Sequence, residues 1–341
     1  MTELTLPARP EEDASPRPVP WRRMAWVTWR QHRLTLAGVA VFLGAWAVYL
    51  WIAGLQAYRA YAAATACHPA SSVACGEFLN QFNYSYGDPA LHTAVFLQAV
   101  PALIGAFAGA PVLARELETG TFRYAWTLAF GRRRWTLAKL VLLAIALAAA
   151  AGAFSLLFSW YYQPFFTDGN ETPFAPEVFD LRGVGFVAWT LAAFAIGALA
   201  GMLIRRVVPA IAATLAAYTG LAFAADLFLR EHYAAPLVTR SPSLPGSAWI
   251  MNQYWTKSGR FAFGWPSNNL LMRLCPSPGP YKQSRETIAQ CLVGHGYRQW
   301  TSYQPVSRFW PFQWIEGGWL LALSVLLIAA TVWLVRRRPI R

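Results

Sequence analysis

The residues best placed for a specific chemical role lie in one short charged segment between two long apolar runs. The segment reads LARELETGTFRYAWTLAFGRRRWTLAK and spans residues 113–139. Glu116 and Glu118 precede its aromatic middle, and the arginine run 132–134 follows it. Acidic residues before a helix and basic residues after it both complement the helix dipole. These side chains therefore offer ionic and apolar contacts around a short helix.

Apolar side chains within this segment recur with the period of an α-helix. Gly120 suits the end of one helix, Thr121 is a good N-cap for the next, and Gly131 can end that one. Between them, five residues fall on one helical face: Phe122, Ala125, Trp126, Ala129 and Phe130. One interpretation is an interfacial helix among lipid headgroups. The other is a coupling helix that transmits force from a soluble motor into the membrane.

Motifs of catalytic centres are absent from the sequence. There is no H-E-x-x-H motif and no His/Cys cluster with metal-ligand spacing, and the five histidines are scattered. There is also no G-x-x-x-x-G-K-[ST] loop to hold nucleotide phosphates. We therefore expect a chain that is not an enzyme and carries no cofactor of its own.

The elements around this segment are long apolar runs, in a chain that is 56% hydrophobic and has 17 Trp. Six runs fit the length of a membrane-crossing helix: 34–57, 91–113, 137–160, 183–204, 207–229 and 314–335. Each is apolar on all faces, unlike an amphipathic helix of a soluble protein. The sequence therefore predicts an all-α polytopic membrane protein with six transmembrane helices.

Arginines predict the orientation of these helices. The short loops richest in arginine lie before the first run, after the second, after the fourth and after the sixth. By the positive-inside rule, these loops and both termini face the cytoplasm. Arginine outnumbers lysine 26 to 3, which is typical of GC-rich bacterial coding, so we expect a bacterial plasma membrane. The net charge of +13 partly reflects this rule, so we expect membrane lipids and no nucleic acid among its partners.

The two ends of the chain are predicted to lie in the cytoplasm. Residues 1–20 contain five prolines and an acidic run without an apolar core, which predicts a disordered tail rather than a signal peptide. Residues 21–33 mix tryptophans with arginines, which favours a helix on an anionic membrane surface. Residues 336–341 form a second short tail.

All four cysteines fall in loops predicted to lie outside the cytoplasm. They are Cys67, Cys75, Cys275 and Cys291. An oxidising compartment favours disulfides, and the local pairs Cys67–Cys75 and Cys275–Cys291 are our prediction among the three possible pairings. Four free thiols are the alternative, whereas the spacing does not fit a zinc knuckle.

The last outer loop, residues 230–313, is far longer than the others. It holds nine Lys/Arg against two Glu, together with fourteen aromatic residues. That apolar surface predicts a small ordered domain held by one disulfide, and Pro305 and Pro311 are expected to interrupt helix. One interpretation is a lid over an exit that favours anionic groups, and the other is a solvated basic cap without a ligand.

Few polar or aromatic side chains in the spans are candidates for a substrate path. They are Gln98, Tyr218, Phe223 and Asp226. Asp226 and Glu316 lie near the outer ends of their spans, so hydration of both is one alternative to a role in the path. Another alternative for Asp226 is an ion pair with Arg230 or another outer arginine. Three further residues make the second run easy to bend or to pack closely: Pro101, Gly105 and Gly109.

The charged segment resembles the loop of type-2 ABC transporter permeases, whose pattern is E-x-E-x-G-T followed by a basic stretch and Gly-Lys. Glu116, Glu118, Gly120, Thr121 and Lys139 match this pattern. Ala138 stands where the family often has Gly, and Phe130-Gly131 replace its usual Pro. Further stretches, VTWRQHRL at 27–34 and YQPVSRFWPFQWIE at 303–316, are similar to actinobacterial permeases.

This resemblance implies six helices per subunit, a cytoplasmic helix before the first, and a coupling helix at 121–131. It also implies two permease copies, as a homodimer, around a central path. The implied contact with a separate ABC ATP-binding subunit, which binds ATP and Mg²⁺, is made by Arg115, Glu116, Glu118, Gly120, Thr121, Phe122, Arg123, Trp126, Phe130 and Gly131.

The implied function is export of an amphipathic drug, peptide or lipid. The alternative is a mechanical relay that passes ATPase strokes to an extracytoplasmic partner without transport.

Overall fold

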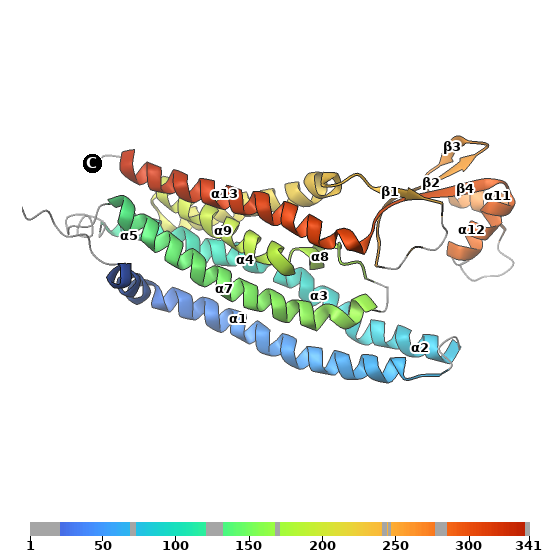
Figure 1. Cartoon of the computed structure of the whole chain (residues 1–341), viewed down its shortest axis with the longest axis horizontal. Helices are drawn as coiled ribbons and strands as arrows, with labels where there is room; N and C mark the ends of the chain where they lie inside the picture. The colour runs from blue at the N-terminus through green and yellow to red at the C-terminus, as the bar shows by residue number, and fades with distance from the viewer. Residues whose placement is uncertain are drawn as a thin grey trace, which may run out of the picture.

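The computed structural model describes residues 21–68, 73–120, 132–167, 171–240, 244, 247–276 and 285–337. Within these residues, six helical segments, each long and apolar enough to cross a membrane, form an elongated bundle, and a small β-sheet lies beyond one end of it (Figure 1). The predicted fold class, a mainly helical polytopic membrane protein with an enlarged loop between spans five and six, is confirmed. The β-sheet within that loop was not predicted.

The six segments follow the chain and alternate in direction along the bundle. They are α1 (Trp21–Thr65); a broken second segment of α2 (Val73–Phe82), α3 (Asp88–Leu97), α4 (Ala99–Ile104) and α5 (Ala110–Thr119); α7 (Arg132–Thr167); α9 (Gly183–Ile204); α10 (Val207–Ala224), extended by η3 (Ala225–Leu229); and α13 (Phe309–Arg337). Each overlaps one predicted apolar run. Several helices extend well beyond the predicted run, because polar residues at the ends of a helix lower the hydropathy without ending the helix.

Four predicted segments fall wholly or partly outside the described residues: the tail at 1–20, the coupling helix at 121–131, parts of the loop domain at 230–313 (241–243, 245–246 and 277–284), and the end of the C-terminal tail at 338–341. Residues 21–33 belong to α1, so the predicted interfacial helix and the first span form one continuous helix. The sixth helix begins at Phe309, five residues before the predicted span. Pro311 lies within its first turn, where the missing N–H has no intrahelical partner to lose, so the expected interruption there is wrong.

Helix α9 lies at the centre of the bundle and contacts α5, α7, α10 and α13. The second segment meets it at a short π-helix, η2 (Gly105–Gly109). A Cβ atom on Gly105 would lie 2.5 Å from the carbonyl oxygen of Ala193, and one on Gly109 would lie 2.6 Å from that of Phe194. Only glycine permits this approach, so the predicted close packing of the second run is confirmed.

The segment between α10 and α13 forms a four-stranded antiparallel sheet with the order β1-β4-β2-β3. Its strands are β1 (Leu237–Thr239), β2 (Trp249–Lys257), β3 (Arg260–Phe263) and β4 (Tyr297–Gln304). Ser258 and Gly259 connect β2 to β3 with positive φ angles of 52° and 79°, as a tight two-residue hairpin turn requires. Trp255 packs with Cys275 and Leu292, and thus with the ends of α11 (Asn268–Leu274) and α12 (Arg285–Gly294).

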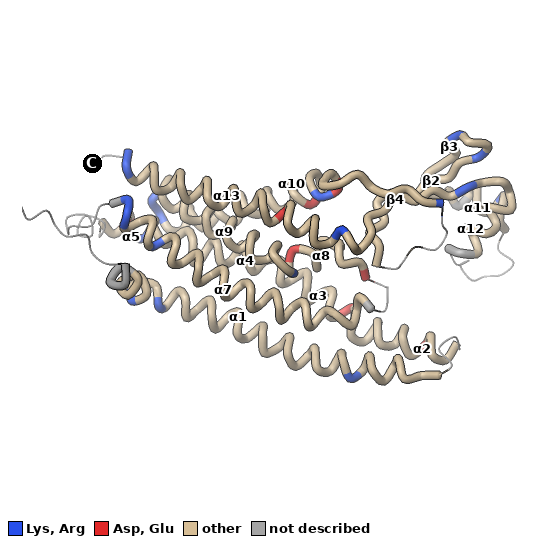
Figure 2. The backbone as a smooth tube through the Cα atoms, viewed as in Figure 1, with Lys and Arg blue, Asp and Glu red and all other residues tan. Residues whose placement is uncertain are grey.

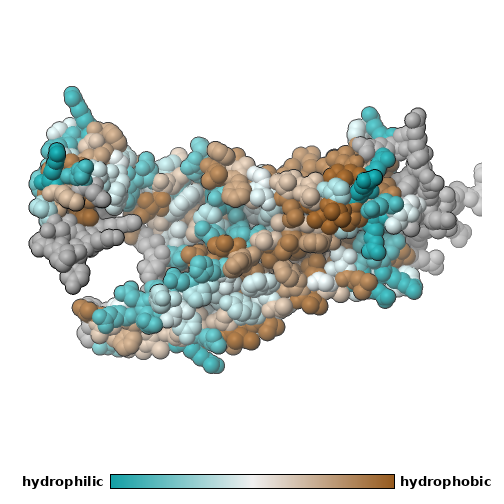
Figure 3. Space-filling view, turned by 180° about the vertical axis from the view of Figure 1, so that it is seen from behind, coloured by the Kyte–Doolittle hydropathy of each residue, from teal (hydrophilic) through white to brown (hydrophobic). Residues whose placement is uncertain are grey.

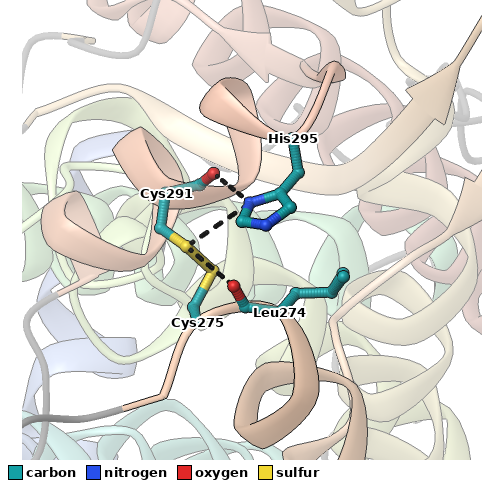
Figure 4. The surroundings of a disulfide bond; sticks show 4 residues. All are labelled: Leu274, Cys275, Cys291 and His295. Atoms are coloured by element: carbon teal, nitrogen blue, oxygen red, sulfur yellow. Dashed lines mark hydrogen bonds between the residues drawn. A yellow bond between two sulfur atoms is a disulfide. The ribbon is translucent and has the colours of Figure 1, made fainter.

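Both predicted disulfides are present in the structure. Cys67–Cys75 joins the end of α1 to α2, with a Cα–Cα distance of 5.5 Å. Cys275–Cys291 joins the end of α11 to α12, with a Cα–Cα distance of 6.0 Å, beside His295 (Figure 4). The second bond therefore fixes the two short helices that pack on one face of the sheet.

Candidate functional site

Charged residues gather at the two ends of the bundle: one end is rich in Lys and Arg, and the other has basic and acidic residues together (Figure 2). We call the end where α5 and α13 finish and α7 begins the basic end, because arginines of several helices lie there. They include Arg30, Arg33, Arg133, Arg134, Arg205, Arg206, Arg336 and Arg337. We call the opposite end, next to the β-sheet, the sheet end.

At the basic end, Glu116 and Lys139 tie α5 to α7. The Lys139 side chain is only 1% exposed, and its Nζ lies 2.5 Å from Glu116 Oε1. The same Nζ donates a hydrogen bond to the carbonyl oxygen of Val112 at 3.1 Å. A buried ammonium without these partners would be costly, so the pair holds the two helices on either side of residues 121–131 in register.

Glu118 ties α5 to a third helix. Its Oε2 accepts a hydrogen bond of 3.0 Å from the backbone N–H of Val207, the first residue of α10. A carboxylate is favourable there because the helix N-terminus carries partial positive charge. The turn before it places Arg205 at a φ of 62° and completes the tight α9–α10 hairpin.

The predicted ATPase-contacting residues divide into two groups. Arg115 is exposed on α5, and Gly120 ends α5 in the left-handed conformation with a φ of 70°, as predicted. With Glu116 and Glu118, these residues surround the point where the chain leaves α5. The others lie outside the described residues: Thr121, Phe122, Arg123, Trp126, Phe130 and Gly131.

The sheet end holds a buried cluster of charges around Arg230 in η4 (Arg230–His232) (Figure 2). This side chain is 1% exposed and bonds Glu316 of α13 at 3.1 and 3.0 Å. It also pairs with Asp226 at 3.1 Å and with Asp180, which follows the short helix α8 (Pro176–Phe179). One guanidinium thus joins three segments that are far apart in the sequence.

Further hydrogen bonds complete the cluster around the fully buried Glu316. Its carboxylate accepts from Trp189 Nε1 at 2.9 Å and from the Tyr233 hydroxyl at 3.2 Å. Burial raises the pKa of the Asp180 carboxyl well above its usual range, nearby carboxylates raise it further, and Arg230 opposes the shift. The expected hydration of Glu316 is wrong, because α8 and η4 cover the end of its helix.

The four predicted substrate-path residues do not gather in one place. Gln98 Nε2 donates to the carbonyl oxygens of Pro176 and Glu177 at 2.9 and 3.0 Å, so it fastens α8 to the second segment. Tyr218 is buried against Trp189 in the core, with ring centroids 5.6 Å apart. Phe223, in contrast, is 63% exposed on the surface of α10.

Asp226, the fourth of these residues, forms the alternative ion pair with Arg230 while remaining 31% exposed. A substrate path along these four residues stays a prediction.

The sheet face opposite Trp255 carries a row of aromatic and basic side chains. Tyr254 stacks with Trp300 at 6.4 Å, and Phe261 lies beyond Tyr254. The Arg240 guanidinium lies 4.1 Å from the centre of the Trp300 ring. The described part of the segment between α10 and α13 therefore forms a sheet with one aromatic and basic face, and its predicted place outside the cytoplasm stays a prediction.

An aromatic cluster joins this domain to the bundle. Phe174, Phe179, Phe309 and Phe312 are buried together, with Trp249 of β2 packed against them. Arg308 donates to Gln304 Oε1 and to the carbonyl oxygen of Ala235, both at 2.6 Å. The last strand of the sheet is thus attached directly to the start of α13.

Six apolar spans, a small-residue interface around α9 and polar braces at both ends define a polytopic membrane protein of the permease type. Residues 37–230, more than half of the 341-residue chain, match the family model "ABC-2 membrane transporter related". The chain therefore belongs to this family of membrane-spanning transporter subunits, which work in general with an ABC ATPase. No curated protein and no solved structure matches it.

Proposed function

We propose that this chain is the permease of an ABC exporter in a bacterial plasma membrane. A separate ABC ATP-binding subunit hydrolyses ATP, and the basic end with both termini faces the cytoplasm. The clustering of arginines at the basic end supports this orientation through the positive-inside rule. The cargo is an amphipathic drug, peptide or lipid-like molecule.

The observation that carries the proposal is the pair of polar contacts next to residues 121–131, namely Glu116 with Lys139 and Glu118 with the Val207 N–H. Both glutamates lie in the last turn of α5, just before this segment, and α7 begins after it, seven residues before Lys139. A force applied to the segment would therefore be transmitted to α5, α7 and α10 through the Glu116–Lys139 ion pair and the Glu118–Val207 hydrogen bond. That arrangement fits a coupling helix better than an interfacial helix that only lies among headgroups.

Two copies of the chain would enclose the export path. Helix α10 and its extension η3 are largely unburied within one copy, and their exposed apolar residues include Val208 and Phe223 of α10 and Leu227 and Phe228 of η3. An apolar helix face in a bundle of this size can meet lipid or another subunit. We assign it to the homodimer, with Phe223 beside the path.

The central experiment replaces Trp126, the predicted anchor of the coupling helix. Trp126→Ala should leave the permease folded but weaken its co-purification with the ATP-binding subunit about thirtyfold, since loss of a buried aromatic anchor commonly costs about 2 kcal/mol or more. Trp310→Ala is a matched control, because Trp310 is exposed at the opposite end of the bundle. Normal ATPase affinity and transport in Trp126→Ala would exclude the coupling role.

A mechanical relay is the second candidate. The attachment of β4 to α13, through Arg308 and the aromatic cluster, supports it because movement of α13 would move the sheet. Flux of a fluorescent amphipathic substrate into sealed vesicles distinguishes the two functions. Export requires flux that depends on ATP, whereas a relay changes the outer domain during hydrolysis without any flux.

A further inference from the structure

A groove between α7 and α13 near the basic end differs from the rest of the apolar surface in the charge at its mouth. Its volume is ≈ 500 Å³. Its lining contains two charged residues, Arg133 and Arg336, and the rest is apolar: Leu137, Val141, Val325, Ile328, Ala329, Val332 and Trp333. Apolar side chains also cover broad areas of the bundle seen from behind (Figure 3), so apolar character alone does not distinguish the groove.

The length of the groove matches one leaflet of a bilayer. Arg336 follows Val325 by eleven positions on α13, which is roughly 16 Å along the helix axis. Half of the hydrocarbon core of a membrane is roughly 15 Å thick. The two arginines therefore lie at headgroup depth, while the apolar walls face the acyl chains of the same leaflet.

Charge distinguishes this end of the groove. Arg133 is in the first turn of α7 and Arg336 is in the last turn of α13, and both are exposed. Within the ranges that the structure describes, no carboxylate forms an ion pair with either side chain. Arg337 lies over the Trp333 ring at 4.4 Å and adds positive charge beside the site.

We propose that this groove binds an anionic glycerophospholipid from the leaflet at the basic end. The phosphate and the second anionic group of the headgroup contact Arg133 and Arg336, and one acyl chain lies along the walls. Paired arginines at the mouth of an apolar groove between helices suit such a headgroup, whereas a zwitterionic lipid brings its own cation to the same place. The site depends on membrane insertion alone and not on export or ATP hydrolysis.

Native mass spectrometry of the purified full-length chain in detergent tests the site. Dioleoylphosphatidylglycerol and dioleoylphosphatidylcholine are titrated separately, and the dissociation constant of the first retained lipid is measured. We expect the wild type to prefer the anionic lipid. The double variant Arg133→Gln/Arg336→Gln should lose affinity for it by about thirtyfold, or about fivefold for each arginine, and bind the zwitterionic lipid as before.

Two further variants keep the test specific. Arg206→Gln removes an exposed arginine at the same end of the bundle but outside the groove, and its lipid affinity should match the wild type. Ala329→Trp fills the exposed wall of the groove and should displace the first bound lipid, whatever its headgroup.

Equal losses in Arg206→Gln and the double variant would overturn the proposal, because they would indicate only general surface charge. A lipid preference that survives both arginine substitutions would overturn it as well. If the double variant changed the number of chains in the complex instead of the number of lipids, the groove would be an interface between copies.

Discussion

The basic end and the sheet end of the bundle hold their helices together in opposite ways. At the basic end, one or two contacts connect each pair of helices: Lys139 bonds Glu116 and the Val112 carbonyl oxygen of α5, and Glu118 accepts from the first N–H of α10. At the sheet end, one buried guanidinium contacts three carboxylates, and indole and phenol groups complete the same cluster. Breaking a single contact frees one helix, whereas breaking the cluster unpairs several charges at once.

This difference assigns a mechanical role to each end. Arg230 and Glu316 each have at least three partners in this cluster, and such a network has few low-energy arrangements, so we expect the sheet end to be rigid. In the proposed transport cycle, the few contacts around residues 121–131 would let α5, α7 and α10 move relative to one another while they stay linked. The comparison therefore predicts large losses of stability from substitutions at the sheet end. At the basic end it predicts small losses of stability with larger losses of coupling.

The largest expected effect follows from removing Arg230. Arg230→Met leaves Asp180, Asp226 and Glu316 close together without a cation, and breaking a buried ion pair costs about 3–5 kcal/mol. The variant should fail to give a monodisperse peak after detergent extraction. Fluorescence-detected size-exclusion chromatography with a heating series measures this.

Asp226→Asn is the matched control for Arg230→Met. It weakens the most exposed member of the cluster and leaves Glu316 paired, so its melting temperature should fall only slightly. Wild-type stability in Arg230→Met would mean that the sheet end is not held by its charges.

The next effect is confined to the sheet and the helices α11 and α12 beside it. Cys275→Ser/Cys291→Ser opens a loop whose closure is worth about 3 kcal/mol in the entropy model, and it frees α12 from α11. We expect rapid proteolysis between β3 and β4 while the bundle remains intact. Cys67→Ser/Cys75→Ser should leave that region protected, and mass spectrometry of non-reduced peptides should recover both local pairs in the wild type.

A smaller loss of stability is expected at the basic end. Glu116→Gln keeps an oxygen near Lys139 but removes its counter-charge, which should cost about 1–3 kcal/mol. Lys139→Met removes the buried cation itself and leaves Glu116, which is 21% exposed, without a counter-charge. It should be less destabilising than Glu116→Gln, which leaves a buried cation unpaired. Melting temperatures of the two variants decide the order, and the reverse order would mean that Lys139 is not held as a buried cation.

Hydropathy predicted the six spans because each is long and apolar, and the cysteines predicted the disulfides because their spacing allowed local closure. The sheet was missed because its short strands lie among charged and aromatic residues without clean alternation. One strand pair, β2 and β4, is separated by about forty residues in the chain, so no hairpin signal joins them. The Ser258-Gly259 turn was the available local signal.

The cluster around Arg230 was predicted only in part. Asp226 and Arg230 are four residues apart, which is a visible helical ion pair, and their pairing was the stated alternative. Asp180 and Glu316 join them only because the loop after α7 and the start of α13 meet in space. A carboxylate inside an apolar run, as at Glu316, is costly unless it is paired, so its position in the sequence was the available signal for a cationic partner.

The smallest effect on stability is expected at Glu118, where the comparison is tested most directly. Glu118→Gln keeps an acceptor for the Val207 N–H but removes the charge at the N-terminus of α10, an interaction typically worth about 0.3–1 kcal/mol. The melting temperature should therefore change little, while Glu118→Ala, which also removes the acceptor, should lower it further.

ATPase activity of the complex, measured with and without transport substrate, reports coupling separately from stability. If Glu118 connects the segment 121–131 to α10, both variants should reduce the stimulation by substrate, and Glu118→Ala should reduce it more. Full stimulation in Glu118→Ala would show that the stroke does not pass through this bond, and the basic end would then be a second static brace.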